Sequence, residues 1–265
     1  MAILLHELRL FFVALQFLTR VPAPGRVGFE PQWLEASVRH FPLVGALVGA
    51  IGGAVGWGAQ LVWPPAVAAA LAVAATLWVT VAFHEDGLAD TFDALLGAAP
   101  RDRALTIMKD SRIGTYGAAA LCLSLLLRVL LLAELLARDP ALAAAACIAA
   151  HAAGRAGAVA LMALLPYAGD EAHAKAKPLA RAVRGGDAAW ACAFGAAAVV
   201  PGAAMTPGAS AAEFGGAAAG VGIVFVVLRA WLRRRLGGYT GDTLGAAEQF
   251  GELAVLLAFA AMGPR

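Results

Sequence analysis

About seven stretches of this chain are long and apolar enough to cross a lipid bilayer, which requires roughly 20 mainly apolar residues in one helix. They cover residues 41–63, 66–83, 116–137, 141–165, 188–206, 214–232 and 247–262. Backbone polar groups find no water inside a bilayer, so stretches of this kind must form helices that satisfy their own hydrogen bonds. The sequence therefore predicts an all-α, polytopic helical membrane protein.

The composition agrees with this fold class. Hydrophobic residues make up 61% of the chain and charged residues 14%, against roughly 45–50% and about 25% in soluble domains. We expect one integral membrane domain over 1–265. Segment 3–19 mixes apolar with charged residues, so it predicts an interfacial amphipathic helix rather than a span or a signal peptide. Cys122, Cys147 and Cys192 lie in apolar runs without metal spacing and are predicted to be core residues.

The basic residues are distributed unevenly between the two sides of the membrane. Fifteen of the 20 Lys and Arg residues fall in the N-terminal region and in segments 84–115, 166–187 and 233–246. The positive-inside rule places these segments in the cytoplasm. The net charge of +2 is too small to indicate a nucleic-acid partner.

Four acids follow the second apolar stretch within ten residues, and no Lys or Arg interrupts them. They are Glu85, Asp86, Asp90 and Asp93. In a helix, the three aspartates would share one face, where their mutual repulsion calls for a cation. Oxygen ligands without cysteine suit Mg²⁺. The alternative is a solvated acidic loop at the membrane surface.

A polar segment at 101–117 brings basic residues to the same side. Lys109 and Arg112 are predicted to bind phosphate oxygens, with Ser111 in a polar turn beside the ligand. Anionic lipid headgroups would account for the same basic residues.

A third polar segment, 237–246, contains four glycines that would let backbone approach a ligand closely. Asp242 within it is a candidate metal ligand or base, or else a helix cap. Glu248 and Glu252 follow at the start of the last span, where acids are functional candidates by default.

Three arginines fall inside predicted spans, namely Arg128, Arg155 and Arg229. The side chain of Arg229 can reach the nearby interface. Arg128 is expected to be structural. Arg155, four residues after His151, either lines the floor of a cytoplasm-facing cavity or is a buried arginine paired with an acid.

Together these segments favour an enzyme of phosphoryl transfer, which needs acids for a divalent metal and basic residues for phosphates. A transporter is the rival interpretation. Transporters place charges near the midplane and often contain internal repeats. No clear repeat occurs here, and the acids stand at the membrane surface.

The chain resembles the cobalamin synthase family (adenosylcobinamide-GDP ribazoletransferase) over nearly its whole length, and only about 166–220 matches weakly. The most specific motifs are His84-Glu85-Asp86-Gly87-Leu88-Ala89-Asp90-Thr91 with Asp93, and Ile107-Met108-Lys109-Asp110-Ser111-Arg112-Ile113-Gly114-Thr115-Tyr116-Gly117. Segments 15–22, 41–45 and 240–246 also match.

The resemblance implies a reaction and a location. Adenosylcobinamide-GDP and α-ribazole, or its 5′-phosphate, would give adenosylcobalamin, or its phosphate, and GMP. The reaction would need Mg²⁺ and take place at the cytoplasmic face of a prokaryotic inner membrane. The expected partners are these substrates and the lipid bilayer, with a homo-oligomer or contacts with other late-pathway enzymes as further possibilities.

The resemblance also suggests roles for residues. Asp86, Asp90, Asp93 and Asp242 would hold Mg²⁺ against the diphosphate, with Glu85 as a weaker candidate. The 5′-hydroxyl of ribazole would attack the cobinamide-side phosphorus. The candidate general bases are Asp90, Asp93 and His84. The substrate-binding candidates are Lys109, Ser111, Arg112, Arg155 and Thr240.

The closest rival class is the CDP-alcohol phosphotransferases, which also use an acid cluster at the membrane surface. Their signature has an Arg after Asp-Gly-x2-Ala, whereas here Asp86-Gly87 is followed by Leu88-Ala89-Asp90, with no Arg and a shorter spacing. This departure argues against transfer to a lipid headgroup.

Overall fold

The computed structural model describes residues 2–25, 27–28, 30–169, 183–206 and 210–262. Within this part of the chain the regular elements are helices and no strand is present, which confirms the all-α fold class. The helices are α1 Ala2–Leu18, α2 Pro31–Ser37, η1 Val38–His40, α3 Phe41–Gln60, α4 Pro65–Thr80, α5 Phe83–Leu95, α6 Arg101–Ile107, α7 Thr115–Arg138, α8 Pro140–Leu164, α9 Gly185–Ala204, α10 Ala211–Arg235 and α11 Gly241–Ala261.

The predicted number of spans is confirmed among the described residues. Six helical segments are long and apolar enough to cross a membrane, and the bent pair α4–α5 would make a seventh. The first of them runs without a break from α2 through α3, over Pro31–Gln60. The N-terminal helix α1 is not among the candidate spans, and it exposes Ile3, Leu4 and Leu8. This exposed apolar side agrees with the predicted interfacial position.

Helices α3 and α8 approach each other closely because α3 presents glycines to its neighbour. A Cβ atom at Gly49 would lie 2.5 Å from the carbonyl oxygen of Cys147, and one at Gly53 would lie 2.8 Å from Cα of Ala144. Both distances are too short for a side chain. The glycine-rich sequence therefore provides close helix packing, as small residues do between membrane helices.

The acidic motif begins at a sharp break in the second apolar segment. Val81 and Ala82 both have left-handed backbone angles, with φ of 57° and 53°. This conformation is strained for residues with a Cβ atom and most of all for a β-branched one. The break bends α4 and α5 by 89°, so the acids occupy a helix of their own.

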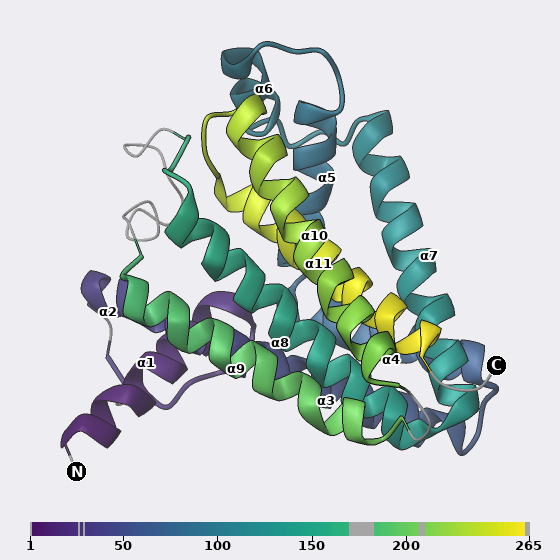
Figure 1. The fold of residues 1–265 in the computed structure, drawn as a ribbon. Coiled ribbons are helices and arrows are strands. Elements are labelled where there is room, and N and C mark those ends of the chain that lie inside the picture. The colour runs from purple at the N-terminus through teal and green to yellow at the C-terminus, as the bar shows by residue number, and fades with distance from the viewer. Residues whose placement is uncertain (1, 26, 29, 170–182, 207–209, 263–265) are drawn as a thin grey trace.

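Helix α5 lies against α7 and α11, and α6 is at the same end of the molecule as the C-terminal end of α10 (Figure 1). Two arginines fix this end. Arg235 donates to the carbonyl oxygens of Leu95 and Gly97 at 3.0 and 2.6 Å. Arg101 donates to the carbonyl oxygens of Leu236 and Ala168 at 2.8 and 2.9 Å. Both arginines satisfy carbonyl groups that the ends of helices and loops leave unpaired.

One minor prediction was wrong. Cys147 is buried as expected, but Cys122 and Cys192 are exposed on the surfaces of α7 and α9. In a membrane protein an apolar sequence indicates contact with lipid as well as with the core, because lipid tails are as apolar as the interior. Neighbouring apolar residues therefore could not assign these two positions to the core.

Candidate active site at the break between α4 and α5

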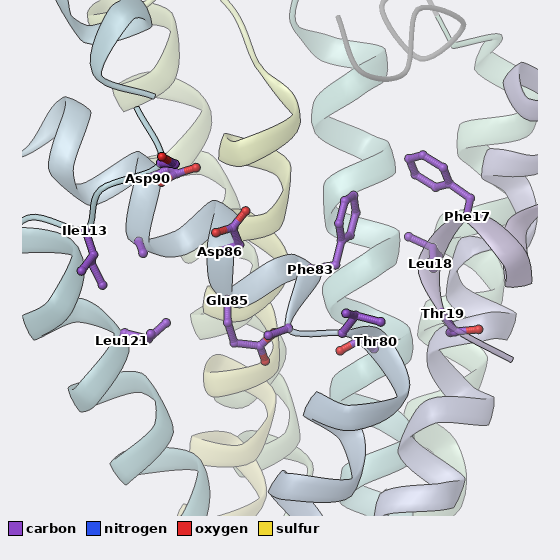
Figure 2. Close-up of a pocket in the computed structure, with 14 residues that line it drawn as sticks. Phe17, Leu18, Thr19, Thr80, Phe83, Glu85, Asp86, Asp90, Ile113 and Leu121 are labelled. Atoms are coloured by element: carbon purple, nitrogen blue, oxygen red, sulfur yellow. The ribbon is translucent and has the colours of Figure 1, made fainter. Parts of the chain in front are cut away.

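A pocket of about 570 Å³ lies beside the break between α4 and α5. The end of α1, the start of α5, the 111–113 loop and α7 contribute to its walls (Figure 2). Its lining residues are Phe17, Leu18, Thr19, Thr80, Val81, Ala82, Phe83, Glu85, Asp86, Ala89, Asp90, Ser111, Ile113 and Leu121. The volume is typical of pockets that bind small molecules, which range over roughly 300–1,000 Å³.

Asp86 and Asp90 line this pocket one helical turn apart on α5, and Glu85 lies below them in the view of Figure 2. The motif is helical, which is the condition for its aspartates to share one face, so it is not an acidic loop. Asp86 is exposed and Asp90 is partly buried. The pocket therefore has two carboxylates on one wall.

Asp242 is brought close to these acids by the packing of α5 against α11. A Cβ atom at Gly87 would lie 2.7 Å from the carbonyl oxygen of Asp242, and one at Gly245 would lie 3.1 Å from that of His84. Glycines at both positions let the helices touch. Asp242 is thus in the first turn of α11 rather than in a loop.

Asp93, the third aspartate on this face of α5, accepts a hydrogen bond at each of its two carboxylate oxygens. It accepts hydrogen bonds from the backbone N–H groups of Gly114 and Gly117, at 2.7 and 2.8 Å. These groups belong to the start of α7, where backbone donors have no partner within the helix. Asp93 therefore connects α5 to the 107–117 motif, and it is not among the residues that line the pocket.

The residues of the basic motif also differ in whether they line the pocket. Ser111 lines the pocket, whereas Lys109 and Arg112 are exposed outside its lining. Arg112 donates to both oxygens of Asp110, at 2.9 Å from Nε and 2.6 Å from Nη2. These hydrogen bonds lower the pKa of Asp110 to about 2. A phosphate bound by Arg112 would have to compete with this carboxylate.

Thr240 has a structural position at the start of α11. Its side chain accepts a hydrogen bond from the backbone N–H of Thr243, and the Thr243 hydroxyl accepts from that of Thr240. This reciprocal arrangement is a capping box. Thr240, and not Asp242, is therefore the residue that caps the helix.

Beneath the pocket, two buried arginines bridge the helices. Arg128 of α7 pairs with Glu85 at 2.6 Å and with Glu252 at 3.2 Å. Arg155 of α8 pairs with Glu248 and lies 3.3 Å from Glu252. The pairing of Arg128 agrees with its predicted structural role, and for Arg155 the position matches the second alternative, a buried arginine paired with acids.

Two histidines beside these ion pairs are also buried. His84 lies 4.0 Å from Glu248, and His151 contacts Glu252. His84 is therefore beside a glutamate of α11. Among the three candidate bases, Asp90 is the one that lines the pocket.

The donor set of the pocket fits a hard divalent cation. Asp86 and Asp90 offer carboxylate oxygens, Ser111 offers a hydroxyl, and the lining contains no thiol or imidazole. Such all-oxygen sets suit Mg²⁺. The buried trio of His151, Glu248 and Glu252 also has ligand atoms within 4.8 Å of one another, but the arginines that pair with its glutamates make it unsuitable for a cation.

The sequence did not reveal the apolar walls of the pocket. In the view of Figure 2 these lie on the two sides of the acids, with Phe17 and Phe83 in one and Ile113 and Leu121 in the other. Phe17 and Phe83 are 66 positions apart, and their ring centroids lie 5.6 Å from each other. A signal was present, because Phe17 lies in the 15–22 segment that carried part of the resemblance.

The fold and the pocket define an integral membrane protein with a pocket that carries acidic side chains. A model of the cobalamin-5-phosphate synthase family matches residues 10–260. The adenosylcobinamide-GDP ribazoletransferase of Leptothrix cholodnii is 55% identical over 261 residues, which cover 98% of both chains. That of Ralstonia nicotianae is 43% identical and covers 97% of this chain and 96% of its own.

The chain therefore belongs to the cobalamin-5-phosphate synthase family. It is a membrane-bound transferase of cobalamin biosynthesis. No solved structure matches it significantly.

Proposed function

We propose that this enzyme joins adenosylcobinamide-GDP to α-ribazole, or to its 5′-phosphate, and releases GMP in a Mg²⁺-dependent reaction. The relatives named above carry this activity in their names. The observation that supports it most directly is the pocket in which Asp86, Asp90 and Ser111 meet. We also propose that the pocket opens to the cytoplasm at a prokaryotic inner membrane, because the basic residues of α6 and those in the last turn of α10 lie at the same end of the molecule (Figure 1).

Asp86 and Asp90 would hold Mg²⁺, with Asp242 as a third ligand from the start of α11. The bound ion would neutralise charge on the diphosphate oxygens. Lys109 and Arg112 would bind phosphate oxygens outside the pocket, and Arg112 would exchange Asp110 for phosphate. Asp93 would act by positioning the 111–117 loop through the two backbone hydrogen bonds that it accepts.

The transfer itself exchanges one phosphorus–oxygen bond for another. A ribose oxygen of ribazole forms a bond to the phosphorus on the cobinamide side. The bond from that phosphorus to the bridging oxygen breaks, and its electron pair leaves with GMP. Asp90 accepts the hydroxyl proton, since it is the candidate base in the pocket wall.

The expectation that the 5′-hydroxyl attacks needs correction on chemical grounds. A substrate that already carries a phosphate at the 5′ position has no free hydroxyl there. Both acceptors can react in the same way only if the nucleophile is another hydroxyl of the ribose.

A product assay tests the proposal. Purified protein in lipid nanodiscs would receive adenosylcobinamide-GDP and α-ribazole, with Mg²⁺ or with excess chelator, and both products would be measured. We expect cobalamin and GMP in equal amounts with Mg²⁺ and neither with the chelator. Equal turnover in the chelator would contradict the metal requirement, and absence of product from folded, Mg²⁺-supplied protein would contradict the reaction.

A further inference from the structure

The lining of the pocket is chemically mixed. In the view of Figure 2, Asp86 and Asp90 lie between two apolar walls, one with Phe17 and Phe83 and the other with Ile113 and Leu121. A ligand that fills this space must join an apolar part to a polar part. A phosphate group alone would leave the apolar walls in contact with water, which costs free energy in proportion to the exposed area.

The aromatic side chains of the wall with Phe17 and Phe83 are held in place by their neighbours. Phe17 stacks on Phe41, with ring centroids 5.9 Å apart, and meets the ring of Phe83 edge to face. Rings fixed in this way present an ordered apolar surface against which an aromatic ligand can pack.

The volume of the pocket indicates which of the two substrates it can enclose. A volume of about 570 Å³ accommodates a nucleoside, which is a small molecule of ordinary size. A corrinoid that carries a nucleoside diphosphate is several times larger. It could bring its diphosphate to Asp86 and Asp90, but the bulk of the molecule would remain outside.

Glu85 adds an acceptor at this site. It lines the pocket and is only 4% exposed. Arg128 and Gln249 both donate to its Oε1, at 2.6 and 3.2 Å. Its Oε2 has no hydrogen-bond partner among the described residues. A buried carboxylate oxygen without a donor is costly, so a ligand hydroxyl that reached it would gain a strong hydrogen bond.

From these observations we infer that the pocket is the binding site of the nucleoside acceptor, α-ribazole. Its aromatic base packs against Phe17 and Phe83, and its ribose hydroxyls face Glu85 and the two aspartates. Ile113 and Leu121 close the opposite side of the pocket. The corrinoid diphosphate approaches the aspartates from outside. The assignment of this ligand rests on the proposed function.

A larger side chain in the apolar wall that contains Ile113 and Leu121 tests the assignment. Leu121→Trp places a larger side chain in the pocket, whereas Leu123→Trp on the same helix is a matched control because Leu123 is 60% exposed and lies outside the lining. We expect Leu121→Trp to raise KM for α-ribazole about tenfold or more, as steric changes in apolar pockets do. KM for adenosylcobinamide-GDP should stay within about twofold of wild type, and Leu123→Trp should change neither value.

Two kinetic results would overturn the inference. If Leu121→Trp raised KM for adenosylcobinamide-GDP alone, the pocket would belong to the corrinoid substrate. If it changed neither KM, the pocket would be a lipid-filled groove. Should Leu121→Trp fail to fold, Ile113→Ala shortens the same wall from a loop, and we expect it to raise KM for α-ribazole several-fold.

Equilibrium binding of labelled α-ribazole to the protein in nanodiscs separates this inference from the reaction. Binding to wild type that Leu121→Trp weakens would support the pocket assignment even if no product formed, so only the proposed reaction would fail. Unchanged binding to Leu121→Trp, or no binding to the folded wild type, would overturn the assignment.

Discussion

Asp86 and Asp93 occupy the same face of α5 but have different surroundings. Asp86 is exposed in the wall of the pocket, and Asp93 accepts two backbone hydrogen bonds from the start of α7. One aspartate is therefore available to a ligand while the other fixes the position of a loop. Sequence spacing alone could not distinguish them, because the donors to Asp93 lie more than 20 residues further along the chain.

This difference predicts opposite behaviour of two similar variants. We expect Asp86→Asn to abolish turnover and leave the melting temperature unchanged, because it removes a ligand charge at an exposed position. Asp93→Asn should lower the free energy of unfolding by about 1–3 kcal/mol, because the neutral amide has one acceptor oxygen for two backbone donors and loses the charge that strengthens these hydrogen bonds. Thermal unfolding and turnover measure both effects. Asp102→Asn, at an exposed position on α6, is the control; wild-type stability in Asp93→Asn would count against the positioning role.

The pair of Asp110 and Arg112 predicts a pH dependence. The pKa of Asp110 is lowered to about 2, so the carboxylate is charged at working pH and its contribution to stability is lost only as the pH falls through about 2. We expect Asp110→Asn to leave the midpoint of the acidic limb of the pH–rate profile at its wild-type pH, in measurements between about pH 4 and 9. Stopped assays across this range measure it, and a shifted acidic limb would show that Asp110 titrates there.

At the scale of elements, the buried ion pairs connect four helices around the site. Arg128 on α7 contacts Glu85 on α5 and Glu252 on α11, and Arg155 on α8 contacts the same glutamate. Glu85 stands next to Asp86 in α5, so this network determines where the aspartates lie. Removing one partner of such a pair leaves a buried charge without compensation.

We therefore expect Arg128→Met to destabilise the protein by about 3–5 kcal/mol. The double variant Arg128→Met with Glu85→Gln should recover part of this loss, because it no longer leaves Glu85 charged and unpaired. Arg103→Met, at an exposed position on α6, is the matched control. Denaturation in a single detergent gives the comparison, and a double variant no more stable than Arg128→Met would contradict the pairing.

The extent of successful prediction also differs between elements. Helix α5 and the shared face of its aspartates followed from the spacing of the acids, and the spans followed from hydropathy. The break before α5 did not, because neither Val81 nor Ala82 is a residue that favours left-handed backbone. The apolar wall with Phe17 and Phe83 depends on the contact of α1 with α5, which is tertiary and leaves no local pattern in the sequence.

For the whole molecule, the position of the basic segments predicts an orientation. Val62, in the connection between α3 and α4, and Asp102, on α6, lie beyond opposite ends of α4 and α5. In a background with Cys122, Cys147 and Cys192 replaced by Ala, we expect an impermeant maleimide added outside intact cells to label Val62→Cys. Asp102→Cys should react only after the membrane is permeabilised. The reverse pattern would place the pocket outside the cytoplasm.

The pairing of Arg128 and Arg155 with glutamates of α11 has a consequence for biogenesis. An arginine at the centre of a helix opposes insertion by the translocon by about 2.5–3.5 kcal/mol. Helix α7 is the most apolar of the candidate spans and can carry Arg128 into the bilayer. Helices α8 and α11 are less apolar, and among the described residues their charged side chains pair with one another and with Arg128 of α7. Because α11 is synthesised after α8, we expect Arg155 to lack its glutamate partners until α11 has been made. A chain that stopped before α11 would expose an unpaired arginine that quality control could recognise.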